Sequence, residues 1–267
     1  MVAGGFPGEF DLYTTTEKFK YVEILDLIDA KVIYDYDHGC EITGLENQSI
    51  MISRGPTSGI LKNNEQEDKI VICGGGSRGV ILGCGQICKS FDLLKRRFNT
   101  SSVQLNENTL WLTGGNGRCE EKTTEFISLH KPPVKGPDLP LAITAHSMVK
   151  VDSKTIYIIG GKYMYKENVF MKDTWICDPT NNFKFKKGPC MNMARNQGIS
   201  CAKMKIDNKN FVVAVHHEVN PGYLPRYSVE EKHEKPIDSV ELLDTSNTEK
   251  GWIIGMYGII FLKCCLN

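Results

Sequence analysis

The chain carries ten cysteines and six histidines, the residue types best suited to bind a metal. An adjacent pair, His216-His217, at first suggests such a site. In a β-strand, however, successive side chains point to opposite faces, so two neighbours do not readily chelate one ion. The cysteines include no paired Cys-x-x-Cys set with the spacing of a zinc site. We therefore expect no metal and no cofactor, and we interpret the histidine pair as the altered end of a repeated strand.

Two pairs of cysteines lie close enough in sequence to suggest disulfide bonds. Cys84 and Cys88 flank a turn before a strand, and Cys190 and Cys201 flank the connection 191–200 between an outer strand and the next inner one. Either pair could be oxidised in a protein that folds in an oxidising compartment. Buried thiols that act as small hydrophobic side chains are the alternative, and both interpretations stay open.

Composition and charge exclude several classes of function. Lys plus Arg and Asp plus Glu each number 32, so no net field favours nucleic acid or a membrane surface. The longest apolar run, 252–262, is shorter than the roughly 20 residues that a membrane helix needs. The glycine pairs of the chain end apolar stretches that no helix follows, so they do not form phosphate-binding loops. We expect a chain that is not an enzyme, binds no nucleic acid and does not insert into a membrane.

The elements that carry these residues repeat along the chain. A short apolar stretch ending in two glycines occurs four times, and a fifth copy ends in His216-His217. From the second glycine of one copy to that of the next, the spacings are 70, 40, 46 and 56 residues, near the roughly 50-residue period of one class of propeller repeat. The copies are Val2–Gly5, Ile70–Gly75, Thr109–Gly115, Thr155–Gly161 and Asn210–His217. Their glycines, expected to be structural, are Gly4, Gly5, Gly74, Gly75, Gly114, Gly115, Gly160 and Gly161.

A second predicted strand follows each copy. These strands are rich in β-branched and aromatic residues, and four of the five end on aspartate, a residue that favours the start of a turn. They are Tyr21–Asp26, Gln86–Asp92, Thr124–Ser128, Asp173–Asp178 and Asp238–Asp244.

In order and spacing, these strands resemble kelch repeats over nearly the whole chain, including the central propeller of galactose-oxidase-type proteins. The best copy, 140–192, predicts four strands at 141–151, 155–161, 173–178 and 183–187. Four antiparallel strands make one blade, and blades pack face to face because none covers its own apolar faces. The resemblance implies an all-β, kelch-type β-propeller of about five blades, in which His146 is a packing residue. We expect one domain over 1–267, with blades at 1–48, 49–100, 101–139, 140–195 and 196–256 and a closing strand in 257–267.

The third blade departs from the pattern. Only 23 residues separate Asp92 from Gly115, too few for an outer strand, a turn and two further strands, so we expect this blade to lack one strand. Kelch propellers more often have six or more blades. A closed five-bladed ring and an incomplete ring that lacks an N-terminal part are therefore both open. The compartment is open as well: cytoplasmic for a complete chain, secreted for one that lacks an N-terminal signal.

The resemblance also implies a function, recognition of an unidentified protein partner by the loops at one end of the propeller. We expect contact residues in the long connections Tyr163–Glu167 and Val219–Arg226, where aromatic and arginine side chains are typical anchors. A galactose-oxidase-like or other carbohydrate-acting enzyme is the alternative, because such enzymes use the same blades with copper held by tyrosine and histidine. The loop tyrosines do not match that motif, and we favour the non-enzymatic scaffold. They are Tyr163, Tyr165, Tyr223 and Tyr227.

Overall fold

A computed structural model describes most of the chain from residue 56 onward and three short strands before it. The described ranges are 2–3, 22–26, 31–35, 56–83, 86–116, 121–163, 169–194, 199–206, 208–215 and 239–256. Within them every regular element is a β-strand, apart from a single 3-10 turn, η2, at Thr248–Lys250. The all-β prediction is confirmed. No helix in these ranges has the length and apolar character needed to cross a membrane.

Four antiparallel sheets of four strands each follow one another in chain order, and we call them sheets I to IV. Sheet I consists of β4 (Pro56–Lys62), β5 (Asp68–Gly74), β6 (Gly76–Gly83) and β7 (Gln86–Arg97). Sheet II consists of β8 (Ser101–Asn106), β9 (Thr109–Thr113), β10 (Thr124–Ile127) and β11 (Val134–Lys135).

Sheets III and IV complete the series, and two smaller sheets accompany it. Sheet III consists of β12 (Ser147–Lys150), β13 (Ile156–Ile159), β16 (Thr174–Asp178) and β17 (Lys184–Lys187). Sheet IV consists of β18 (Ser200–Ile206), β19 (Lys209–Val215), β20 (Ser239–Asp244) and β21 (Trp252–Met256). A three-stranded sheet precedes them, with β1 (Val2–Ala3), β2 (Val22–Asp26) and β3 (Lys31–Asp35), and a short hairpin pairs β14 (Lys162–Tyr163) with β15 (Val169–Phe170).

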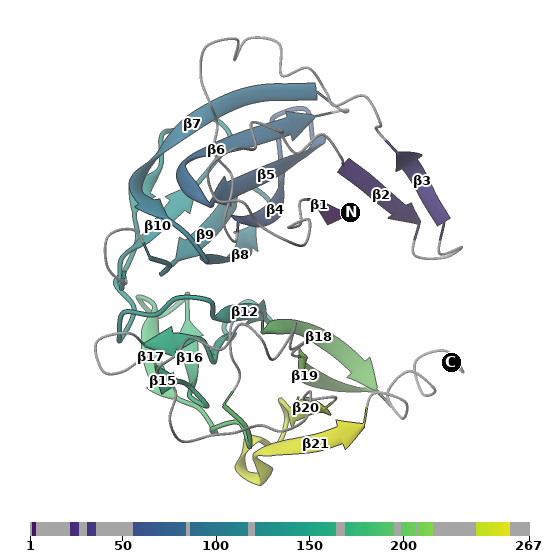
Figure 1. Cartoon of the computed structure of the whole chain (residues 1–267), viewed down its shortest axis with the longest axis vertical. Coiled ribbons are helices and arrows are strands. Elements are labelled where there is room, and N and C mark those ends of the chain that lie inside the picture. Colours follow the sequence, from purple (N-terminus) through teal and green to yellow (C-terminus); the bar gives the residue numbers. More distant parts are fainter. Residues whose placement is uncertain are drawn as a thin grey trace, which may run out of the picture.

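The sheets stand side by side around an arc, with the first strand of each toward the centre (Figure 1). Consecutive first strands contact one another, from β4 to β8, β8 to β12 and β12 to β18. Three apolar clusters fill the spaces between neighbouring sheets, and Leu110, Trp111 and Tyr157 are among their largest buried side chains. Each sheet thus covers an apolar face of the next, the packing expected of propeller blades. The described strands do not close the ring between the three-stranded sheet and sheet IV.

Sheet III agrees with the four strands predicted for 140–192, but sheet II corrects a prediction. We expected one strand of this blade to be missing, yet all four are present. The reason lies in sheet I, where 86–97 forms the outermost strand β7, and 76–83 forms an additional strand, β6, that the sequence analysis did not predict. Since β7 is already the outer strand, only a short turn and β8 must fit before Thr109. The predicted closing strand at 257–267 lies outside the described residues.

Candidate functional site

The glycine pairs make the contacts between neighbouring sheets. The six glycines of the three described pairs all have positive φ, between 57° and 97°, a backbone conformation that other residues adopt only with strain. A Cβ added to Gly114 would lie 2.5 Å from the Ile143 carbonyl oxygen and 2.8 Å from His146 Cε1. A Cβ added to Gly161 would lie 2.9 Å from His146 Cβ. The His146 side chain therefore lies between the first glycine of sheet II and the second glycine of sheet III.

The same arrangement recurs at the contact between sheets I and II and at the contact between sheets III and IV. Thr100 precedes β8 as His146 precedes β12, and its hydroxyl would lie 2.5 Å from a Cβ on Gly74. Ile199 precedes β18, and its Cδ1 would lie 3.2 Å from a Cβ on Gly160. Gly4 and Gly5 lie outside the described residues, as does the His216-His217 pair. At five of the six glycines, all but Gly75, an added Cβ would thus lie within 3.1 Å of another residue.

His146 is a packing residue, as predicted. Its side chain is buried, and its Nε2 lies 2.7 Å from the Thr113 hydroxyl. Burial lowers the pKa of His146 to about 3, so the ring is neutral at physiological pH. The described residues hold no group of three or more His, Cys, Asp or Glu side chains placed to bind a metal.

A buried ion pair ties the end of β7, the outer strand of sheet I, to the third strand of sheet II. Arg97 Nε donates to Glu125 Oε1 at 2.8 Å, and each side chain is 1% exposed. Arg97 also donates to the carbonyl oxygens of Gly114 and Thr123, while Glu125 accepts the backbone N–H of Leu94. Such a pair is tolerated inside a protein only when its polar atoms are satisfied in this way.

Sheet III carries an apolar pair at the equivalent positions. The bridges Phe98–Asn116 and Thr144–Lys162 align Arg97 with Ile143, and the strand register aligns Glu125 with Trp175. Both replacements belong to the apolar cluster between sheets II and III. Sheet III therefore lacks both the cation and the anion, so neither position holds a buried charge without its partner. In sheet IV the equivalent residue is again an acid, Glu241, which is buried and accepts hydrogen bonds from the Asn192 backbone and side chain.

Of the two cysteine pairs for which a disulfide and free thiols were both open, the structure describes the side chains of one. Cys190 and Cys201 are free thiols in it, the first exposed and the second partly buried. Cys84 lies outside the described residues, and of Cys88 only the backbone is described. Cys73 and Cys177 are buried thiols, and burial raises the pKa of each to about 12.

Of the loops predicted to contact a partner, the structure describes only Tyr163. Its side chain is half-buried and packs against the apolar cluster between sheets II and III. Segments 164–168 and 219–226 lie outside the described residues. A G-x-S-x-G pattern that the sequence analysis missed spans Gly75 to Gly79, but Ser77 lies on β6 between antiparallel strands. A nucleophilic serine requires a strand-turn-helix context, which this segment does not have.

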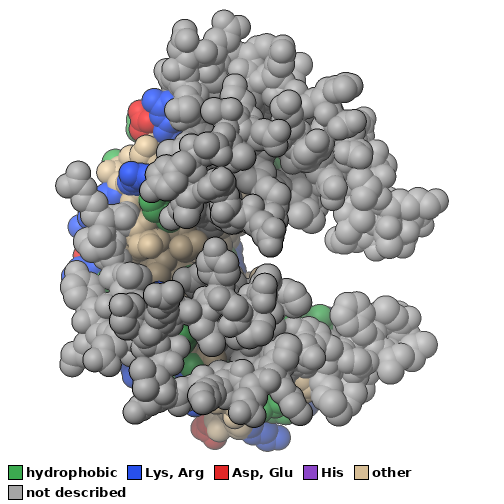
Figure 2. Space-filling view, in the orientation of Figure 1, with side chains coloured by type: hydrophobic (Ala, Val, Ile, Leu, Met, Phe, Trp, Pro, Cys, Tyr) green, Lys and Arg blue, Asp and Glu red, His purple; other side chains and the backbone are tan. Residues whose placement is uncertain are grey.

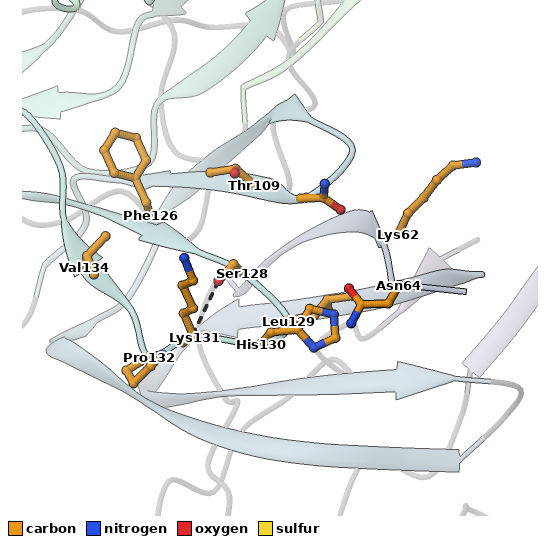
Figure 3. Close-up of a pocket in the computed structure, with 11 residues that line it drawn as sticks. Lys62, Asn64, Thr109, Phe126, Ser128, Leu129, His130, Lys131, Pro132 and Val134 are labelled. Carbon is orange, nitrogen blue, oxygen red and sulfur yellow. Dashed lines mark hydrogen bonds between the residues drawn. The ribbon is translucent and has the colours of Figure 1, made fainter. Parts of the chain in front are cut away.

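A groove lies along the ends of sheets I and II, opposite the glycine pairs (Figure 3). Its volume is about 480 Å³. The lining residues come from the end of β4, the turns that follow β4 and β8, and the turn between β10 and β11. They are Lys62, Asn64, Asn108, Thr109, Phe126, Ser128, Leu129, His130, Lys131, Pro132 and Val134.

The groove has an apolar part and a polar part. In Figure 3, Phe126, Pro132 and Val134 lie together at one side, while His130 and Asn64 lie together toward the other. Val134 is 54% exposed although it belongs to a strand. The lining includes two lysines and a histidine but no acidic residue.

Internal hydrogen bonds hold the turns around the groove in place. Asn63 Oδ1 accepts the backbone N–H groups of Glu65 and Glu67, and Asn106 Oδ1 accepts that of Asn108. The Lys62 backbone N–H donates to the Glu107 carbonyl oxygen at 2.6 Å, which joins the two sheets at the groove. The third turn contains Pro132-Pro133, whose φ angles are fixed by their rings. The groove is therefore a preformed feature of the fold.

Comparison with known proteins addresses the fold. No family model matches the sequence, and no curated protein matches it. Among solved structures, the chain is similar to one described as "Structure of YjhT", with a TM-score of 0.54 and 13% identity over 76% of this chain and 65% of that chain. The chain folds as a kelch-type β-propeller. It spans slightly less than two thirds of that structure, and at this identity the similarity concerns the propeller fold alone.

A second similar structure is described as a novel fungal alcohol oxidase of the AA5 family in complex with copper. Its TM-score is 0.43, with 14% identity over 54% of this chain and 34% of that chain.

Sheets I and II are two neighbouring blades of the propeller, and the groove lies along their ends. This end of the propeller carries the turns that join the first strand of a blade to the second and the third strand to the fourth. Sequence reasoning missed the groove because its residues come from three separate turns that no motif connects.

Proposed function

We propose that this kelch-type propeller is a non-catalytic scaffold that binds a segment of a protein partner in the groove along the ends of sheets I and II. The observation that supports this proposal is the preformed groove itself, with an exposed apolar side and hydrogen-bonding side chains on one rigid frame. Binding sites of this kind combine apolar contact area with a few placed polar groups. Because the walls are already ordered, a partner loses little free energy to ordering them.

The apolar side would supply the anchor. Val134 and Phe126 lie on neighbouring strands in register, and the Phe126 ring packs against Phe183 with the ring centroids 5.4 Å apart. Phe126 is therefore held in place from behind, while Val134 offers open surface to a partner. A bulky apolar side chain of the partner fits this corner, as interface anchors do elsewhere.

The polar side would fix the orientation of the bound segment. Asn64 and Asn108 each offer an amide that can donate to and accept from a peptide backbone. Their turns are held by the hydrogen bonds of Asn63 and Asn106, so the backbone that carries these amides has a defined position. An extended segment of a few residues is the shape that contacts both sides at once.

A selection of displayed dodecapeptides against the folded chain tests the proposal. Each selected peptide is then measured against Val134→Asp and against Ile254→Asp, a matched control, since Ile254 is 53% exposed on the outer strand of sheet IV. We expect peptides whose binding is lost with Val134→Asp and kept with Ile254→Asp. A selection that yields no peptide sensitive to Val134→Asp contradicts the proposal.

A further inference from the structure

We infer that the segment bound in the groove is acidic: an extended peptide that places a bulky apolar side chain at Val134 and carboxylates beside Lys62, His130 and Lys131. This inference rests on the proposed function, because it names the chemical class of the partner for the same groove. Its basis is the charge of the lining, which contains three basic side chains and no acidic one.

Within the part of the chain that the structure describes, the two lysines have no acidic partner. Neither Lys62 Nζ nor Lys131 Nζ makes an ion pair or hydrogen bond with any of the described residues. Elsewhere on the same two sheets lysines do pair with acids, as in Lys69 with Glu67 and Lys95 with Glu121. The unpaired charges of the groove are therefore available to a ligand of opposite sign.

The turns around the groove also carry three acids that do not line it, Glu65, Glu67 and Glu107. Glu67 is engaged by Lys69 and by the Asn63 side chain, and these bonds hold the pKa of its carboxyl below the usual range. It remains ionised and paired with a lysine outside the groove. A partner with carboxylates would complement the three basic side chains of the lining.

Ion pairs occur on the surface outside the groove. Figure 2 shows basic side chains at several places along the outer rim of the arc and acidic ones at a few. Lys122 pairs with Asp138, and Lys187 pairs with Asp173. With 32 basic and 32 acidic residues the chain has no net charge, so a local cluster, and not a general field, would attract the partner.

A peptide explains the lining better than a nucleic acid does. Phosphate backbones are bound by extended basic surfaces that neutralise many phosphates, and the groove offers only two lysines and a histidine. The apolar side of the groove, by contrast, can contact a ligand favourably only if the ligand carries an apolar side chain. Charged groups on such a rim mainly control the rate of association and the choice of partner.

The test uses the selected peptides whose binding depends on the groove. We expect them to be enriched in Asp and Glu relative to the starting library, and we expect Lys62→Glu/Lys131→Glu to weaken them by about tenfold or more. The control is Lys184→Glu/Lys186→Glu, a matched charge reversal at exposed lysines on the outer strand of sheet III, which should leave binding unchanged.

Four outcomes separate the two proposals. Groove-dependent peptides without acidic enrichment would overturn the acidic inference and leave the binding function standing. The same inference falls if the charge reversal at 184 and 186 weakens binding as much, or if single-stranded oligothymidylate displaces the peptides. A selection without groove-dependent peptides would overturn the binding function, and the acidic inference with it.

Discussion

The Arg97 guanidinium and the Glu125 carboxylate form an ion pair of 2.8 Å inside the protein, with each side chain 1% exposed. Together they fasten the end of β7, the outer strand of sheet I, to the third strand of sheet II. The apolar pair Ile143 and Trp175 takes the same place in sheet III. Neighbouring blades of the chain therefore fill equivalent positions in two ways, one with a buried ion pair and the other with two apolar side chains.

Removing one member of the ion pair should destabilise the fold strongly. Arg97→Met leaves Glu125 as a buried charge without its cation, and we expect a loss of about 3–5 kcal/mol in the free energy of unfolding. Glu125→Gln should cost a comparable amount, and the double variant less than the sum of both. Urea unfolding followed by tryptophan fluorescence measures the cycle, with Lys95→Met at a partly exposed pair as the control of small effect. If the losses in free energy of unfolding for Arg97→Met and Glu125→Gln simply add up in the double variant, the two residues are not coupled and the prediction is wrong.

Gly114 and Gly160, the first glycines of two pairs, should differ in how well they tolerate replacement by alanine. Gly114 and Gly160 have similar φ angles, 57° and 61°, so Gly→Ala introduces similar backbone strain at both. A Cβ at Gly114 meets a backbone oxygen at 2.5 Å, whereas one at Gly160 meets the flexible end of Met191 at 3.1 Å. We expect Gly114→Ala to cost about 1–3 kcal/mol more than Gly160→Ala. Equal midpoints in thermal or urea unfolding would show that close approach does not set the requirement for glycine.

The buried histidine should give the fold a pH dependence. The pKa of His146 is about 3 in the folded protein and near its ordinary 6.5 in the unfolded chain. Between these values the unfolded state binds a proton that the folded state does not. Stability should therefore fall as the pH is lowered from 6.5 toward 3, by at most about 1.4 kcal/mol per pH unit from this residue.

Comparing pH slopes isolates this effect. The variant His146→Gln keeps a hydrogen-bonding group near Thr113 but removes the titration, so its stability should change less steeply over the same pH range. The slope is the readout, because the variant also changes the absolute stability. Identical slopes for the wild-type protein and His146→Gln would contradict the assignment.

Thiol reactivity should follow burial. In the native protein at pH 8, we expect iodoacetamide to modify exposed Cys190, while Cys73 and Cys177 react only after unfolding, because their pKa values are raised to about 12. Mass spectrometry of peptides from native and urea-treated samples measures each site. Modification of Cys73 in the native protein at the rate of Cys190 would contradict the buried environment.

The repeated strands made the propeller predictable from sequence, because glycine pairs at propeller spacing have few other uses. The four strands of sheet III were predicted because each carries its own apolar run and turn signal. Sheet I was misread because Gly76–Gly83 looks like a loop: its glycines hide a strand whose neighbours, β5 and β7, supply the pairing. Pairing is a tertiary property that local composition does not record.

The candidate site was less predictable than the fold. His146 could be recognised as a packing residue through its place in the repeat. Lys62 and Lys131 could not be assigned to a site, since they are far apart in sequence and come to line the same groove only when sheets I and II pack. Turn residues of this kind read as ordinary solvated loops until the turns of adjacent blades are placed side by side.

The most direct test of the account is a methyl NMR titration of the full chain with a groove-selected peptide. The account predicts chemical-shift changes at the methyl groups of Val134, Leu129 and Thr109, which line the groove, and none at Ile253 and Ile254 on β21. Changes confined to the opposite end of the propeller, at residues such as Ile143 and Thr144 beside the glycine pairs, would contradict it.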